Sequence, residues 1–188
     1  MGERVALGPL LRELLPRYQS WLNDVHTQSW AGYPQRPEPW THERMVNWYE
    51  RAATEQDRMW FTIYETAGWK ALGFCILRDI DQRHRTAEFG ITIGNRGDRG
   101  KGYGSEAVKL LLDLAFTGLG LHNVQLQVFE FNHGGVRAYQ RAGFKEIGRR
   151  RGAHFMGGRF WDVVYMDCIA EEFSSPVLGD LLAAENSG

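Results

Sequence analysis

The glycine-rich segment Arg99-Gly-Lys-Gly-Tyr-Gly104 decides the fold of this chain. It follows an alternating stretch at residues 86–93 that predicts a strand, and it leads into an apolar pattern of helical period at residues 105–118. Glycines let a backbone approach an anion closely, and the first N–H groups of a helix have no partner within the helix. Arg96 and Lys101 add positive charge. The order of strand, glycine turn and helix therefore predicts a phosphate-binding site.

Three glycines in alternation are also compatible with other roles. In the plainest alternative they only permit tight packing of a turn. A dinucleotide site needs a parallel sheet and an acidic residue at the end of its second strand, whereas the strands before residue 99 are predicted to be antiparallel. A P-loop ends in Gly-Lys-Ser or Gly-Lys-Thr, and no such tripeptide ends this turn. These two nucleotide-binding motifs are therefore excluded, and the packing alternative stays open.

Hydrophobic periodicity and turn residues place the remaining elements. The expected strands are residues 4–8, 59–64, 71–77, 86–93, 123–129, 144–151 and 159–169. The expected helices are residues 10–22, 41–53, 105–118 and 134–142, with a proline-rich loop at residues 31–39. This order predicts an α/β fold with a mixed (α+β) sheet of six to seven mostly antiparallel strands, one parallel pair and about four flanking helices. We expect a single domain at residues 1–170 and a flexible tail at residues 171–188.

The composition is that of a soluble globular protein. Of 188 residues, 43% are hydrophobic and 24% are charged, and the formal net charge is −1. A net charge near zero argues against nucleic acid or an anionic membrane as a partner. Cys75 and Cys168 lie in apolar strands and are expected to be buried free thiols of a reducing compartment. With no leader-like start and no apolar stretch long enough to span a bilayer, we expect a cytoplasmic protein.

Further motifs extend the pattern beyond the glycines. They are Ala87-Glu-Phe-Gly-Ile-Thr-Ile93, Arg99-x-x-Gly102-x-Gly104, Ala115-Phe116, Leu119-Gly-Leu-His122, Asn132 and Ala138-Tyr-Gln-Arg-Ala-Gly-Phe144. In this order and spacing, over residues 59–169, they resemble the GCN5-related N-acetyltransferase (GNAT) family, in particular its branch of ribosomal-protein N-terminal and spermidine acetyltransferases. The resemblance implies the GNAT fold, in which the parallel strand pair splays apart. It also implies acetyl-CoA as the acyl-donor substrate, with no metal.

The family's cofactor contacts carry over by position. Backbone groups of the strand before the turn would bond the pantetheine arm, and the amides of the turn would hold the pyrophosphate. An asparagine after the fifth family strand would bond the arm where the parallel strands splay. The cofactor-binding residues implied in this way are Ile91, Thr92, Ile93, Arg99, Gly100, Lys101, Gly102, Tyr103, Gly104, Ser105 and Asn132. Arg137 and Arg141, close to the splay, are further candidates for binding phosphate.

Acyl transfer from a thioester to an amine needs a base for the amine and a proton for the thiolate that leaves. Tyr139 matches the family pattern Asn-x(6)-Tyr-x(3)-Gly-Phe and is the implied acid, although its helix face also suits packing. Glu88 lies on the strand face opposite Phe89 and is the candidate base; the alternative is an exposed or salt-bridged strand glutamate. No His, Cys or Asp spacing fits a metal site.

The acceptor amine is less constrained. Several tryptophans fall early in the chain, and some of them are expected to line a cleft. In the family, the first helices, their loop and the last hairpin shape the acceptor pocket, which makes Tyr33 and Trp40 the candidate substrate-binding residues. An aromatic wall suits a ring-bearing or peptide amine. A polyamine needs an acidic channel, to which only Glu65, Asp79 and Asp81 contribute.

The sequence therefore predicts an acetyl-CoA-dependent N-acetyltransferase that acts on a primary amine, of a protein N-terminus or a small molecule, by direct attack in a ternary complex. Cys75 and Cys168 lack an adjacent base, which argues against an acyl-enzyme. A polyamine or an amine antibiotic stays open as the acceptor. An acyl-CoA-binding sensor without turnover stays open as a different class of function. The family's habit makes a homodimer the expected assembly.

Overall fold

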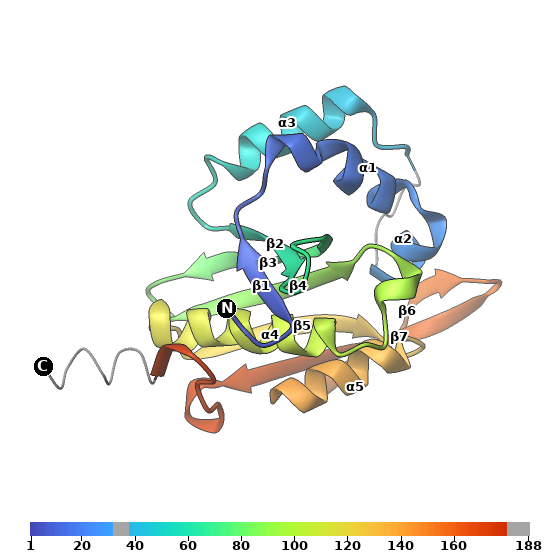
Figure 1. Cartoon of the computed structure of the whole chain (residues 1–188). Helices are drawn as coiled ribbons and strands as arrows, with labels where there is room; N and C mark the ends of the chain where they lie inside the picture. Colours follow the sequence, from blue (N-terminus) through green and yellow to red (C-terminus); the bar gives the residue numbers. More distant parts are fainter. Residues whose placement is uncertain (32–37, 180–188) are drawn as a thin grey trace, which may run out of the picture.

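A computed structural model describes residues 1–31 and 38–179 of the chain, apart from the side chains of residues 30 and 31. One sheet forms the centre of the molecule (Figure 1). Its strands are β1 (Val5–Gly8), β2 (Met59–Glu65), β3 (Ala71–Asp81), β4 (Thr86–Ile93), β5 (Asn123–Phe129), β6 (Lys145–Met156) and β7 (Arg159–Ile169). The main helices are α1 (Leu15–Asn23), α2 (Val25–Ala31), α3 (His42–Ala52), α4 (Tyr103–Asp113) and α5 (His133–Ala142).

The seven strands lie in the order β1-β2-β3-β4-β5-β7-β6, and only β4 and β5 are parallel neighbours. Their pairing runs from Thr86 opposite Asn123 to Glu88 opposite Gln125 and then ends. Beyond this point the two strands are not paired, so an edge of β4 is left open in the middle of the sheet. The predicted mixed sheet with one parallel pair is confirmed.

Helices cover both faces of the sheet. Figure 1 shows α1 and α3 on one face and α4 and α5 on the other. Under α4 and α5, the side chains of Val108, Leu111 and Leu112 join the buried residues of β4 and β5 in one core. Burial of such side chains stabilises each layer by about 1.5–3 kcal/mol per side chain. The layer of α4 and α5 therefore packs against β4 and β5 on one face of the sheet, and the layer of α1 and α3 packs against β2 and β3 on the other face.

The second core, under α1 and α3, is aromatic. Tyr18 lies edge-on to Trp48, with ring centroids 5.8 Å apart, and Trp48 lies edge-on to Trp60 at 5.0 Å. Trp21 and Phe74 complete the cluster, with centroids 6.5 Å apart. Tryptophan side chains bury large areas, so a few of them fill the space between two helices and a sheet. Trp21 and Trp48 are thus core residues, and Trp60 is half-buried against them.

Most predicted elements are confirmed, but several differ at their ends, β3 and β6 extend beyond the predicted strands, and the helix α2 was not predicted. The helix expected at residues 10–22 begins with a short 3-10 turn, Arg12–Leu14, before α1. Pro16 lies in the first turn of α1, where its missing N–H costs no hydrogen bond. The helix expected at residues 105–118 begins at Tyr103, and its last turn, Leu114–Gly118, is a π-helix. The loop expected at residues 31–39 includes residues 32–37, which lie outside the described residues.

Residues 170–179 contact the domain although they belong in part to the predicted tail. The buried Asp113 carboxylate on α4 accepts hydrogen bonds from the amides of Val177 and Leu178 at 3.0 and 2.9 Å. Phe173 packs against Phe116, with ring centroids 5.4 Å apart. A flexible tail stays a prediction for residues 180–188, which lie outside the described residues.

Candidate active site

A cavity of about 800 Å³ lies where β4 and β5 diverge. Its walls come from the end of β4, the glycine turn, the first turns of α4 and α5, and α2. The structure brings together most of the residues predicted for the site. Those that line the cavity are Ile91, Thr92, Ile93, Arg99, Gly100, Gly102, Gly104, Ser105, Asn132 and Tyr139. A cavity of this size between diverging strands is typical of a small-molecule or cofactor site.

The glycine turn has a backbone shape that other residues adopt only with strain. Gly100 and Gly102 have φ angles of +77° and +90°, in the left-handed region. A Cβ atom on Gly102 would also lie 2.8 Å from the Nη1 atom of Arg4. Gly102 precedes α4 and gives it no side-chain cap. The first amides of α4 are therefore left for another acceptor at the edge of the cavity.

The N-terminus of α5 faces the same cavity. Asn132 caps this helix, because its side-chain oxygen accepts a hydrogen bond from the Gly135 amide at 2.9 Å. His133, Gly134 and Gly135 follow in the cavity wall. Two helix N-termini therefore direct their partial positive charge into one space.

Charged side chains make the cavity more positive. Arg96, Arg99, Arg137 and Arg141 line it, and Asp98 is the single acidic residue among the described residues of its wall. With the two helix ends, these arginines favour an anionic ligand. Arg137 and Arg141 are thus placed as expected for candidates that bind phosphate.

The buried Asp98 braces the glycine turn. Its carboxylate accepts hydrogen bonds from Lys70 Nζ at 3.0 and 2.9 Å and from Asn95 Nδ2 at 3.1 Å. Burial opposes ionisation of Asp98, but the hydrogen bonds from Lys70 and Asn95 outweigh it and lower the pKa of the carboxyl. Asp98 is therefore an ionised anchor that ties the turn to the start of β3, and its charge is compensated.

Three predicted residues of the turn contact protein groups. The Arg99 guanidinium bonds Thr27 of α2 at 2.8 Å. The Tyr103 hydroxyl donates to Glu65 on β2, and the carbonyl of Lys101 accepts from Arg4 Nη1 at 3.1 Å. The cofactor contacts predicted for Lys101 and Tyr103 therefore concern their backbone amides, and they stay predictions.

Tyr139 lies on α5 in the cavity wall and is 9% exposed. Its ring is edge-on to Phe89 and Phe144, with centroids 6.1 and 6.0 Å away. Burial raises the pKa of the Tyr139 hydroxyl to about 12. The phenol therefore keeps its proton at neutral pH and is able to donate it.

Glu88 lies at the last paired position before β4 and β5 diverge, outside the cavity lining. Its side chain is 11% exposed and forms an ion pair with Arg78, the residue opposite on β3. The salt-bridged alternative that the sequence left open is therefore present. The positive charge of Arg78 therefore compensates the Glu88 carboxylate, which lies close to the point where β4 and β5 diverge.

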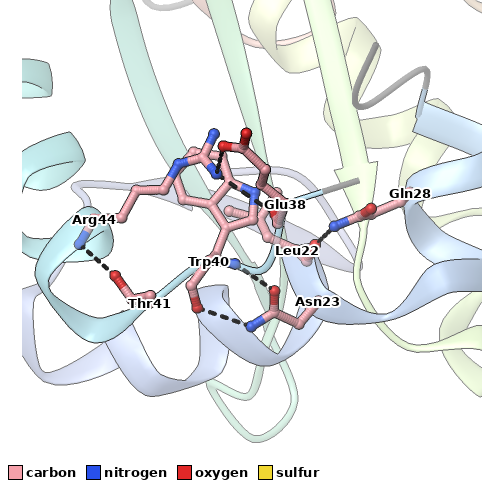
Figure 2. Close-up of polar contacts among 7 residues, drawn as sticks. All are labelled: Leu22, Asn23, Gln28, Glu38, Trp40, Thr41 and Arg44. Atoms are coloured by element: carbon pink, nitrogen blue, oxygen red, sulfur yellow. Dashed lines mark hydrogen bonds and ion pairs between the residues drawn. The ribbon is translucent and has the colours of Figure 1, made fainter. Parts of the chain in front are cut away.

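The residues predicted to bind the acceptor are less well placed. Tyr33 lies outside the described residues. The backbone of Trp40 is held by the Asn23 side chain, which accepts from its amide at 2.7 Å and donates to its carbonyl at 3.0 Å (Figure 2). The guanidinium of Arg44 lies over the Trp40 ring, 4.0 Å from its centroid. One face of this ring is thus already used by a cation, and a substrate-binding role for Trp40 stays a prediction.

Other chemistries find little support in the described residues. Cys75 and Cys168 are buried free thiols, and burial raises the pKa of both, that of Cys168 to about 11. Thiols of this kind are poor nucleophiles. Within residues 1–31 and 38–179, no three His, Cys, Asp or Glu side chains gather as metal ligands would. No helix in the same residues has the length and hydrophobicity needed to cross a bilayer.

Sequence patterns missed several residues of the site, and three of them make side-chain contacts that shape it. His26 and Thr27 of α2 line the cavity, and Asp98 supports the turn from inside. The signal for Thr27 was Asp24, three residues earlier, because an aspartate before a helix commonly caps it. No signal in the sequence pointed to the bracing role of Asp98, since its ion-pair partner Lys70 lies 28 residues earlier in the chain.

A family model described as acetyltransferase (GNAT) domain matches residues 4–145. Alpha/beta-tubulin-N-acetyltransferase 9 of Mus musculus is 23% identical over an alignment of 158 residues that covers 78% of this chain and 64% of the relative. Spermidine N(1)-acetyltransferase of Escherichia coli K12 is 33% identical over 121 residues, 64% of this chain and 63% of the relative. The chain thus covers less than two thirds of the length of either relative.

A solved structure with a similar fold is the spermidine N-acetyltransferase of Vibrio cholerae in complex with CoA and spermine. It superposes with a TM-score of 0.81 and 26% sequence identity, over 90% of this chain and 97% of the other. The two chains therefore share the fold over nearly the whole of both.

Proposed function

The chain belongs to the GNAT acetyltransferase family, and from this premise we propose that it transfers an acetyl group from acetyl-CoA to a primary amine. The observation that carries the proposal is the positive cavity of about 800 Å³ between the diverging strands β4 and β5, with two helix N-termini in its wall. Coenzyme A is a polyanion with an extended arm, so its chemistry suits this space.

The cofactor's two parts have different partners in this proposal. Amides of the turn from Gly100 to Ser105 hold the pyrophosphate, because the left-handed glycines leave the backbone open. The pantetheine arm lies along Ile91–Ile93, where the pairing of β4 with β5 has ended. An extended amide chain that pairs with an open strand edge gains main-chain hydrogen bonds. Asn132, at the start of α5, contacts the arm from the other side of the splay.

The reaction needs two proton transfers. The neutral amine attacks the thioester carbonyl carbon, a C–N bond forms, and the C–S bond breaks as the thiolate leaves. Tyr139 donates its hydroxyl proton to the sulfur and recovers one from solvent. Glu88 accepts the proton of the amine, directly or through a water, with Arg78 compensating its charge. The place of Tyr139 in the cavity wall supports the acid role, and its raised pKa keeps the phenol protonated until the thiolate forms.

Transfer is direct, in a ternary complex. The thiols of Cys75 and Cys168 are buried with raised pKa values, which disfavours an acetyl-enzyme. A cytoplasmic location, a homodimer and independence from metal ions, nucleic acid and membranes belong to the same proposal.

The acceptor is a primary amine of a peptide or small molecule. A polyamine is the second candidate, supported by the similar structure that holds CoA and spermine. The acidic residues available for a polyamine are few, because Glu65 accepts from Tyr103 and Asp81 pairs with His84. Neither carboxylate lines the cavity.

The proposal is tested by thiol release from acetyl-CoA with N-terminal peptides, spermidine and an aminoglycoside as separate acceptors. We expect release with at least one amine, together with an acetylated product of equal amount. Micromolar binding of coenzyme A without release on any amine would instead indicate a sensor. If the protein neither binds coenzyme A nor releases thiol with any amine, the assignment of the cavity to coenzyme A would be contradicted.

A further inference from the structure

Arg99 stands in the turn to which the proposed function assigns the pyrophosphate, yet its guanidinium reaches α2. Its Nη2 atom donates to Thr27 Oγ1 at 2.8 Å and to the Ile93 carbonyl at 3.1 Å. Its Nε atom bonds the same carbonyl at 3.2 Å, and Nη1 lies 3.1 Å from His26 Nδ1. One side chain thus joins the glycine turn, the end of β4 and α2.

Thr27 is the centre of this contact. It is 2% exposed, and its hydroxyl lies 2.6 Å from Asp24 Oδ2 and 3.0 Å from the Gly94 carbonyl. The same Asp24 oxygen accepts from the Thr27 amide at 2.7 Å. Hydrogen bonds from the Thr27 side chain and amide lower the pKa of Asp24. The group Asp24, Thr27 and Arg99, here called the α2 clamp, is therefore a connected polar network with an ionised carboxylate.

The clamp leaves Arg99 poorly suited to bind phosphate. A guanidinium has five N–H donors in a rigid fork, and bidentate binding of phosphate uses a pair of parallel donors. The contacts to Thr27, Ile93 and His26 occupy the fork on all three nitrogens. Arg96, three residues earlier, is exposed and lines the same cavity. It lies in the short helix Arg96–Asp98 just before the turn, and its charge faces the cavity.

Resting on the proposed function, we infer that Arg99 is a positioning residue for the acceptor side of the cavity and does not bind the cofactor phosphates. Figure 1 shows α2 on the same side of the sheet as α1 and α3, across from α4. The phosphates belong at the start of α4, so α2 bounds the opposite wall, through His26 and Thr27. The clamp fixes that wall to the end of β4 and to the turn that the cofactor occupies.

Two substitutions remove the clamp in different ways. Arg99→Met keeps much of the side-chain volume without its donors, and Thr27→Val keeps the shape of the threonine without its hydroxyl. Arg96→Met is the matched control, since it removes the same charge from the segment just before the turn, and no contact of Arg96 with α2 is among those described. All three variants are compared with the wild type for coenzyme A affinity, for the amine KM at saturating acetyl-CoA, and for amide hydrogen exchange of residues 25–31.

We expect Arg99→Met and Thr27→Val to speed exchange in residues 25–31 and to raise the amine KM about tenfold, with coenzyme A affinity within about threefold of the wild type. Arg96→Met should show the reverse: weaker coenzyme A binding and unchanged exchange in α2. The inference is overturned if Arg99→Met weakens coenzyme A binding as Arg96→Met does while exchange in α2 stays as in the wild type.

Exchange and coenzyme A binding need no turnover, so the two proposals fail separately. If the wild type acetylates no amine but the clamp variants loosen α2 with coenzyme A affinity kept, the proposed function fails and the clamp stands. If Arg99→Met does not fold, Thr27→Val carries the test alone. Unchanged exchange and unchanged amine KM in Thr27→Val would then contradict the inference.

Discussion

Lys70 and Asp98 form an ion pair in which the Lys70 ammonium contacts both carboxylate oxygens, at 3.0 and 2.9 Å. Lys70 immediately precedes β3, and Asp98 lies in the short helix Arg96–Asp98 just before the glycine turn. Because the Asp98 side chain is 8% exposed, this pair is screened less by solvent than the surface pairs of the molecule. It fixes the turn relative to the sheet before any ligand arrives.

Replacing Asp98 with Asn should therefore weaken both the fold and the site. We expect the free energy of unfolding to fall by about 1–3 kcal/mol, since a buried charged acceptor is lost, and coenzyme A affinity to fall with it. Glu50→Gln is the control, because the Arg12–Glu50 pair is exposed on both sides and should change stability by about 0.5 kcal/mol or less. Denaturant unfolding and calorimetric titration measure the two effects. Equal values for both variants would show that the pair does not brace the turn.

Gly102→Ala tests the glycine turn itself. At a φ of +90°, with Arg4 close to the new Cβ atom, alanine forces the turn to change shape. We expect coenzyme A affinity to drop about tenfold or more, because the amides before and in the first turn of α4 would move. Gly97→Ala is the matched control: nothing lies within 4 Å of its new Cβ atom. Similar affinities for the two variants would remove the turn from the cofactor site.

Tyr139→Phe tests the proton donor. Its ring should still pack against Phe89 and Phe144, so coenzyme A affinity and thermal stability should change little. Loss of the hydroxyl should lower kcat about 100-fold, the lower range for removal of a general acid. Because the pKa of Tyr139 is raised to about 12, the wild type should show no loss of kcat from this group below about pH 11. Unchanged turnover in the variant would end the assignment.

His154 predicts a pH effect on stability. Its ring stacks on Phe129, with centroids 3.9 Å apart, and burial lowers its pKa. The unfolded chain takes up a proton on this residue near pH 6.5, whereas the folded protein does so only at lower pH. The stability that the neutral imidazole contributes is thus present above about pH 6.5 and is lost as the pH falls through the folded pKa.

His154→Phe should therefore flatten the loss of Tm between about pH 7.5 and pH 5.5, as measured by scanning calorimetry of both proteins. His122→Phe is the comparison, because the His122 side chain is about half exposed and pairs with Glu171. A His154→Phe variant with the same pH slope as the wild type would contradict the assignment of this effect to His154.

The sequence predicted the elements whose structure depends on residues that are close together in the chain. The glycine turn, the α4 helix after it and the Asn132 cap of α5 all depend on residues within a few positions of one another. Burial alternates along β5 as the strand pattern suggests, whereas in β4 the polar residues Glu88 and Thr92 are buried as well. Because one parallel pair follows from the order of the elements, the main features of the fold were accessible from the sequence.

Contacts between distant segments were not accessible. Arg99 looks like a phosphate ligand in the sequence, and only the fold places it against Thr27, 72 residues earlier. Asp98 and Lys70 likewise meet through the sheet. For Glu88, the sequence left a base and an ion pair open, since it does not show that Arg78 lies opposite in register. Tertiary packing decides such partners, and the pattern of residues in a single sequence holds no signal for them.

The most direct measurement of the central claim is a rapid-quench single-turnover experiment. It uses acetyl-CoA that carries a label in the acetyl group and an amine that supports thiol release. Our account predicts that the label moves from coenzyme A to the amine at the same rate as free thiol appears, with none bound to the protein at any time. Label that stays on acetyl-CoA with every amine would contradict acetyl transfer, and label that accumulates on the protein before it reaches the amine would contradict direct attack.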